Sequence, residues 1–232
     1  MSERIRHPLF RDRITSAAEA AAAIRPGMTV AMSGFTGAGY PKAVPQALAA
    51  RVEQANAAGE RFRIKVLTGA STAPELDGAL AKVEGMELRL PYQSDPAVRE
   101  RINAGTLDYI DIHLSHVAQH AWFGFFGKLD VAVVEVAGIR EDGSLVPSSS
   151  VGNNKTWLEQ ADKVILEVNS WQPAALDGMH DVYYGTAVPP HRKPILLERP
   201  DDRNFAFSPP DEASRRIADH LPDFLRTRAA SP

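Results

Sequence analysis

Short apolar runs alternate with alanine-rich stretches along the chain, and this alternation predicts its elements. Five runs rich in β-branched residues indicate strands, at 29–33, 63–68, 87–90, 130–136 and 163–168. Three of them are apolar almost without interruption, as strands covered on both faces are. Helical stretches lie at 16–25, 41–59, 153–161 and 211–225. Together they are typical of an α/β fold with an open, mostly parallel sheet and flanking helices.

The capping residues, prolines and glycines that separate these elements are consistent with a single domain. The first helix follows Thr15 and Ser16, either of which can cap it, and stops before a Pro-Gly pair. The segment 178–212 is rich in Pro, Gly and Asp and is interpreted as irregular. We therefore expect one domain over 1–225 and a disordered tail over 226–232.

The amino-acid composition argues against several classes of ligand and covalent chemistry. The chain has 232 residues, a net charge of −3 and no cysteine. This balance gives no polybasic surface for nucleic acid or an anionic membrane. The lack of cysteine excludes disulfides, cysteine-ligated metal and a thiol nucleophile. No signal core and no apolar run near the roughly 20 residues of a membrane helix are present, so we expect a cytoplasmic protein.

A glycine-rich loop connects the first strand to the helix at 41–59. Backbone N–H groups in such a loop can face an anion. Gly34, Gly37 and Gly39 are spaced three and two apart, which reverses the order of the dinucleotide fingerprint. Lys42 does not follow a glycine, so the Walker pattern is absent as well. A purely structural turn is the alternative at this point.

The string "GMTVAMSGFTGAGYPKAVPQAL" (27–48) resembles the N-terminal signature of class I coenzyme A transferases. The resemblance is to the acetyl-CoA hydrolase/transferase branch, which includes succinyl-CoA:acetate CoA-transferases. Further stretches agree in the family's order: "LTGAST" (67–72), "RINAG" (101–105), "DIHLSHVAQ" (111–119), "DVAVVEV" (130–136), "EDGSLVPSSSVGNN" (141–154), "KVILEVN" (163–169) and the closing "DDRNFAFSPPDEASRRIADHL".

The resemblance implies a CoA-transferase-like domain from a two-domain enzyme whose active site lies between the halves. In that family a glutamate attacks an acyl-CoA thioester to give an acyl-glutamyl anhydride. The CoA thiolate returns to form a glutamyl-CoA thioester, and a second carboxylate then takes the CoA. The implied substrates are acyl-CoA and small carboxylic acids. No permanently bound cofactor is expected, and the complete enzyme is expected to be a homo-oligomer.

The resemblance also implies that the catalytic glutamate is missing, because the family carries it in the second domain. Glu135 and Glu167 belong to first-domain motifs and are interpreted as caps at strand ends or sheet-edge ion pairs. Glu75 and Glu159 are interpreted as solvated helical residues. We assign no nucleophile and expect a complementary C-terminal domain or subunit to supply it. An excised domain, a natural subunit and a truncated product with another use all remain open.

In the family, the first domain lines the small-acid side of the pocket. The matching positions are Ser71, Ser94 and the loop Gly34, Phe35, Thr36, Gly37, Ala38 and Gly39. Hydroxyl and N–H groups suit a carboxylate. Each serine also has a structural interpretation: Ser71 with Thr72 as a turn or helix cap, and Ser94 with the following Asp-Pro as an N-terminal cap, which we favour.

Three further features need an interpretation. Ser150 and Asn153 either face a ligand or end a strand and cap a helix, which we slightly favour. His113, His116 and His120 share part of a helix face, but nothing completes a known zinc spacing, so no metal is expected. The aromatic stretch 120–126, with Trp157 and Trp171, is predicted to be mainly core, with part of it facing the second domain.

Two functions compete on this basis. The first is the N-terminal half of an acyl-CoA hydrolase or CoA-transferase acting on acetate, succinate or propionate and inactive alone. The alternative is a catalytically inactive small-acid-binding or assembly module with the same fold. A nucleotide-dependent dehydrogenase is disfavoured by the reversed glycine spacing.

Overall fold

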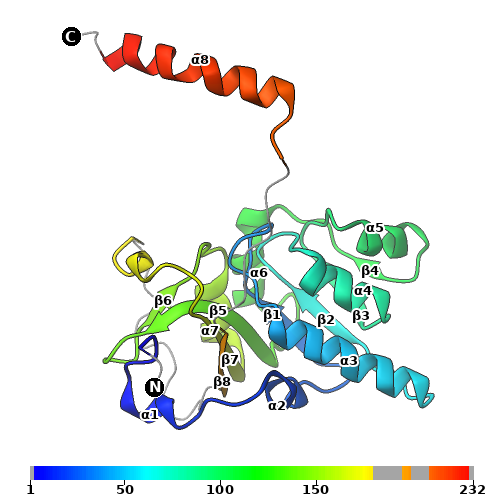
Figure 1. Ribbon diagram of the computed structural model, residues 1–232. Helices are drawn as coiled ribbons and strands as arrows, with labels where there is room; N and C mark the ends of the chain where they lie inside the picture. Colours follow the sequence, from blue (N-terminus) through cyan, green and yellow to red (C-terminus); the bar gives the residue numbers. More distant parts are fainter. Residues whose placement is uncertain (1–2, 180–194, 200–208, 230–232) are drawn as a thin grey trace.

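The computed structural model describes residues 3–179, 195–199 and 209–229. A sheet with the order β4-β3-β2-β1-β5-β7-β8 forms the centre, all its neighbours parallel, and β6 pairs antiparallel with β5 (Figure 1). The strands are β1 Thr29–Met32, β2 Ile64–Leu67, β3 Met86–Leu90, β4 Asp108–Tyr109, β5 Val131–Ile139, β6 Leu145–Pro147, β7 Lys163–Asn169 and β8 Ile195–Arg199. The predicted fold class is confirmed.

Helices cover both faces of the sheet, but α8 is not among them, since its described side chains are all exposed. The helices are α1 Pro8–Arg11, α2 Ala17–Ala22, α3 Ala43–Ala57, α4 Ala79–Lys82, α5 Pro96–Asn103, α6 Leu114–Trp122, α7 Asn154–Gln160 and α8 Glu212–Ala229, with single turns η1 Pro74–Gly78 and η2 Ala174–Leu176. In the part of the chain described, no helix is both long and apolar enough to cross a membrane.

The five predicted strands and four predicted helices are confirmed, with shifts at their ends. Ser16 begins α2 through a capping box with Glu19, as one of the two predicted caps. The predicted disorder after 225 is wrong for 226–229, because α8 runs past Pro222, which lies inside it, and continues to Ala229 without a further glycine or proline. Residues 230–232 lie outside the described residues.

The sequence pattern missed several short elements. The segment interpreted as irregular, 178–212, contains β8, which pairs in parallel with β7 from Ile165↔Ile195 onward. Most of the remaining segment is not described. The other missed elements are two to four residues long (β4, β6 and α1). Elements this short carry little periodicity, and their pairing partners decide their conformation.

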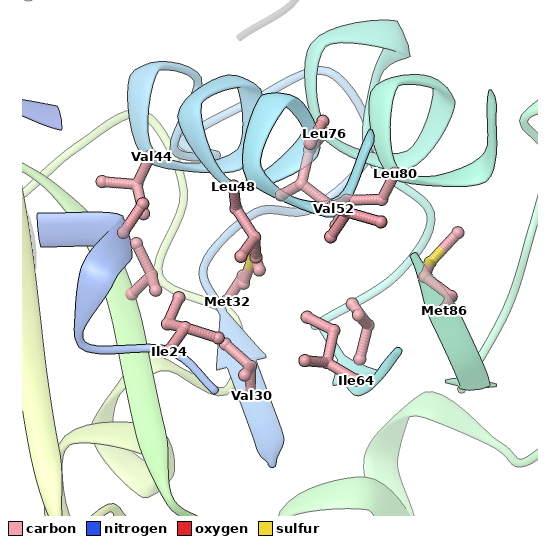
Figure 2. Packing of buried hydrophobic residues seen from close by; sticks show 14 of the residues in the cluster. Ile24, Val30, Met32, Val44, Leu48, Val52, Ile64, Leu76, Leu80 and Met86 are labelled. Atoms are coloured by element: carbon pink, nitrogen blue, oxygen red, sulfur yellow. The ribbon is translucent and has the colours of Figure 1, made fainter. Parts of the chain in front are cut away.

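Two hydrophobic clusters fill the layers on the two faces of the sheet. On one face, α3 points Val44, Leu48 and Val52 toward residues of β1 and β2 such as Met32 and Ile64 (Figure 2). The opposite face is covered by α6 and α7, whose buried residues pack against β5 and β7. Burial on both faces explains why β5 is apolar almost throughout.

The predicted aromatic core is largely wrong. Trp157 is fully buried, but Trp122, Phe123 and Phe125 are 52%, 66% and 71% exposed, and Trp171 is 42% exposed. The first three lie at the end of α6 and in the turn after it, and only Val117 of that helix is buried. An aromatic composition therefore did not distinguish core from surface here. That this face meets a second domain remains a prediction.

Candidate functional site

The glycine loop 34–39 leaves the carboxyl end of β1 and closes on itself. The N–H of Phe35 donates to the carbonyl of Ala38 at 3.0 Å, and the N–H of Ala38 donates back at 3.3 Å. The hydroxyl of Ser33 donates to the carbonyl of Gly39 at 2.7 Å and so draws the two ends of the loop together. Gly34 and Gly39 have φ values of 125° and 65°, which favour glycine.

Other loops press against this one at the same edge of the sheet. A Cβ on Gly34 would lie 2.7 Å from the Cβ of Tyr40, and a Cβ on Gly69 would lie 2.7 Å from the carbonyl oxygen of Gly34. A Cβ on Gly39 would lie 2.9 Å from the backbone nitrogen of Ser150. The loops after β1, β2 and β6 therefore meet backbone to backbone. In a parallel sheet, this carboxyl edge is where ligands bind.

Two buried carboxylates lie beneath the loop. Glu135 on β5 and Glu167 on β7 are register partners, and both are fully buried. Glu167 accepts the first N–H groups of α3: those of Lys42 and Ala43 on Oε1 at 2.6 and 3.0 Å, and that of Val44 on Oε2 at 3.1 Å. A carboxylate at a helix N-terminus satisfies unpaired N–H groups and is stabilised by the helix dipole.

Glu135 forms a buried ion pair with Lys42. The Lys42 Nζ lies 2.5 Å from Oε2 of Glu135 and donates to the carbonyl of Tyr40 at 2.9 Å. Asn169 also donates to Oε2 at 3.1 Å, while Gln172 donates to Oε1 at 3.3 Å and Ser148 to the same oxygen. Charge and hydrogen bonds thereby compensate the burial of this carboxylate.

The interpretation of these glutamates as strand-end caps or sheet-edge pairs is wrong. They lie inside central strands because α3 begins directly above them and its N-terminus and Lys42 need anionic partners. Each carboxylate is engaged by several donors and is fully enclosed. We name Glu135, Glu167 and Lys42 the carboxylate clamp.

A second buried ion pair shapes the loop after β2. Asp77 accepts from the backbone N–H and the hydroxyl of Thr72, both at 2.7 Å, and from Nε of Arg89 at 2.8 Å. Nη2 of Arg89 also donates to the hydroxyl of Thr68 at 2.8 Å. Burial alone raises the pKa of Asp77, but the charge and hydrogen bonds of Arg89 and the bonds from Thr72 outweigh it, and this pKa is lowered.

The two predicted serines come together. The hydroxyl of Ser94 donates to Oγ of Ser71 at 2.9 Å, and the N–H of Ser94 donates to it at 3.0 Å. The hydroxyl of Ser71 in turn donates to Oε1 of Gln93 at 2.6 Å. Ser71 is fully buried and Ser94 is exposed. The sequence did not predict Gln93 as a site residue, although it directly precedes Ser94 in the stretch "PYQSDP" (91–96).

The structural interpretations of these serines have mixed outcomes. The cap before α5 is confirmed, and Asp95 provides it by accepting from Ala97 and Val98 at 2.9 and 3.2 Å. Ser71 and Thr72 do not cap η1, whose N-cap residue is Ala73 and has no side-chain bond. The side chain of Thr72 binds Asp77 instead.

Two further polar residues and two glutamates singled out in the sequence have structural contacts or lie at the surface. Ser150 donates to the carbonyl of Ala38 at 2.9 Å, so it fastens the glycine loop. Asn153 stands at the N-cap of α7 without a side-chain cap bond. Glu159 is exposed as predicted, whereas Glu75 is half-buried and accepts from the hydroxyl of Tyr40 at 3.1 Å.

The three histidines lie on one side of α6. Their ring centroids are 5.5 Å apart between His113 and His116 and 6.2 Å apart between His116 and His120. His113 occupies the N-cap and accepts from the N–H of Ser115. Within residues 3–179, 195–199 and 209–229, no group of three or more His, Asp or Glu side chains is arranged to hold a metal ion.

The sequence of the chain is similar to those of known proteins. Residues 2–187 match the model of the acetyl-CoA hydrolase/transferase N-terminal domain. The chain belongs to this family. It is 43% identical over 201 residues to the succinyl-CoA:acetate CoA-transferase of Clostridium kluyveri, covering 87% of the chain and 37% of that enzyme. It is 37% identical over 211 residues to the propanoyl-CoA:succinate CoA transferase of Escherichia coli, covering 90% and 43%.

Solved structures show the same fold. RipA from Yersinia pestis matches with a TM-score of 0.64 at 17% identity, over 91% of this chain and 49% of that protein. A 4-hydroxybutyrate CoA-transferase from Porphyromonas gingivalis matches with a TM-score of 0.51 at 20% identity, over 86% and 43%. The chain thus spans less than half the length of these two relatives and two structures.

The clamp predicts unequal effects of two isosteric substitutions. Glu135→Gln leaves the buried ammonium of Lys42 without a counter-charge and is expected to lower the free energy of unfolding by about 3–5 kcal/mol. Glu167→Gln keeps an acceptor oxygen for α3 and is expected to cost about 0.5–2 kcal/mol. Urea denaturation measures both, with the exposed Glu159→Gln as control. Equal losses at 135 and 167 would contradict the assigned roles.

The lowered pKa of Asp77 predicts a pH dependence of stability. A depressed folded pKa stabilises the fold above the unfolded value of about 3.9, and this contribution is lost as the pH falls toward the folded pKa. The stability difference between the wild type and Asp77→Asn should therefore be large at neutral pH and shrink in acid. Urea midpoints measured from neutral to acidic pH give this difference, with exposed Asp219→Asn as control. A stability difference between wild type and Asp77→Asn that stays constant with pH would contradict a lowered pKa of Asp77.

Proposed function

We propose that this chain is the N-terminal half of an enzyme that moves coenzyme A between short carboxylates, or, in a hydrolase, releases free coenzyme A when water cleaves the thioester. The meeting of the glycine loop with the loops after β2 and β6, at the carboxyl edge of the sheet, is the observation that carries the proposal. Such an edge presents backbone and hydroxyl groups to a small ligand. The named activities of the relatives point to the same chemistry.

The proposed reaction follows the family's covalent route. A glutamate of the complementary half attacks the acyl-CoA carbonyl, and the C–S bond breaks to give an acyl-glutamyl anhydride and CoA thiolate. The thiolate attacks the glutamyl carbonyl and releases the first carboxylate, leaving a glutamyl-CoA thioester. A second carboxylate then takes up the CoA by the reverse steps.

In this proposal, the present chain binds and orients the acid. Loop 34–39 and the hydroxyl of Ser94 face the carboxylate, and Ser71 supports Ser94 from below. The engagement of Glu135 and Glu167 in the clamp supports a nucleophile from elsewhere. The relatives' greater length supports a second half. The cytoplasmic location, the homo-oligomer and the choice among acetate, succinate and propionate stay predictions.

Reconstitution tests this function. The chain alone should transfer CoA from succinyl-CoA to acetate at background rate. Addition of the separately produced C-terminal half of the Clostridium kluyveri relative should give transfer above that background. The two halves of that relative, mixed in the same way, are the matched control.

Two results would overturn the proposal. One is full turnover by the purified chain alone, which would place the nucleophile within it. The other is an inactive mixture under conditions in which the relative's own halves recombine to an active enzyme. Saturable acetate binding by the chain, together with an inactive mixture, would favour the small-acid-binding module instead.

A further inference from the structure

A buried donor without a partner lies beside Ser71. The side chain of Gln93 is 7% exposed and follows the carboxyl end of β3. Its Nε2 is buried and has no hydrogen-bond acceptor in the part of the chain that the structure describes. Buried polar groups in native proteins are almost always paired with protein, water or ligand. An unpaired amide nitrogen in a candidate site therefore needs an occupant.

The orientation of this amide is fixed by its neighbours. The backbone N–H of Asp95 donates to Oε1 of Gln93 at 2.8 Å, and the hydroxyl of Ser71 donates to the same oxygen at 2.6 Å. A backbone N–H can only donate, so the atom opposite Asp95 must be the oxygen. Exchange of the two amide atoms would place two donors against each other. The unpaired end is therefore the NH₂ group.

Ser71 itself is already committed within this cluster. Its oxygen accepts from the N–H and the hydroxyl of Ser94, and its proton goes to Gln93. A carboxylate is an acceptor and needs donors. In this arrangement the donor that is not yet used is the amide of Gln93, and the hydroxyl of exposed Ser94 becomes a second donor by rotating away from Ser71.

We propose that the side-chain amide of Gln93 donates a hydrogen bond to a carboxylate oxygen of the small acid. This inference rests on the proposed function and adds a binding residue to its pocket. The loop that carries Ser71 also contains Gly69, where an added Cβ would lie 2.7 Å from the carbonyl oxygen of Gly34, so the cluster of Ser71 and Gln93 adjoins the glycine loop. A neutral donor recognises the acid without a buried cation, which would require a counter-charge.

Nuclear magnetic resonance on the full chain tests this directly. The side-chain NH₂ signals of Gln93 are assigned by their loss in Gln93→Glu. Titration of the ¹⁵N-labelled chain with sodium acetate, against sodium chloride at equal ionic strength, should shift these signals and the backbone amides of 34–39 along one saturation curve.

The titration has two contrary outcomes. If the loop amides respond to acetate while the Gln93 signals do not, the amide is satisfied by water and the inference falls, although the proposed function stands. If neither the Gln93 signals nor the loop amide signals respond to acetate, the inference is also wrong. The proposed function is then tested separately by the reconstitution assay.

A substitution gives a second, independent measurement. Gln93→Glu keeps an acceptor oxygen for Asp95 and Ser71 and removes the NH₂ group. It should weaken acetate binding about ten-fold or more, with a preserved pattern of backbone signals. Gln54→Glu makes the same change at an exposed position on α3 and should leave the affinity within about two-fold. Unchanged affinity in Gln93→Glu would overturn the inference.

Discussion

The carboxylate clamp is the constraint on which the site depends. Two carboxylates in register on neighbouring parallel strands would repel each other in an apolar interior, and each is stabilised there by a different partner, a helix N-terminus for one and an ammonium group for the other. Glu167 receives the N-terminus of α3, and Glu135 receives Lys42. Because Lys42 also holds the carbonyl of Tyr40, and Ser33 holds that of Gly39, the end of the glycine loop is fixed to the sheet by the same network.

Within the chain, the buried carboxylates stabilise the fold, and different groups line the candidate site. The carboxylates that the sequence offers on central strands are used to hold backbone, and the groups that reach the loop edge are N–H and hydroxyl donors. In the part of the chain that the structure describes, such an edge offers donors that suit an anion, while both central-strand carboxylates are engaged in the clamp. This supports the proposed division of labour with a second half and gives the unpaired amide nitrogen of Gln93 its importance.

The sequence predicted what periodicity and glycine spacing can reveal. The long apolar strands and α3 were confirmed, and Ser71 and Ser94, chosen by resemblance, lie within hydrogen-bonding distance. The clamp was not predicted, since whether a charge within an apolar run is buried depends on what packs above it. The signal was present in one lysine after the loop and two glutamates inside apolar strands. The prediction that the aromatic residues at the end of α6 and after it are core was wrong for the same reason. Composition does not say which side chains a helix and its following turn direct toward the sheet.

Amide hydrogen exchange at the loop tests the central claim most directly. The N–H groups of Phe35 and Ala38 are hydrogen-bonded within the loop, and those of Ile64 and Lys65 in β2, which β1 separates from β5, donate to Gly85 and Met28. If the clamp positions the loop, Glu135→Gln should speed exchange at Phe35 and Ala38 by a larger factor than at Ile64 and Lys65. Equal acceleration at all four amides would mean that Glu135 only stabilises the fold, and would contradict the account.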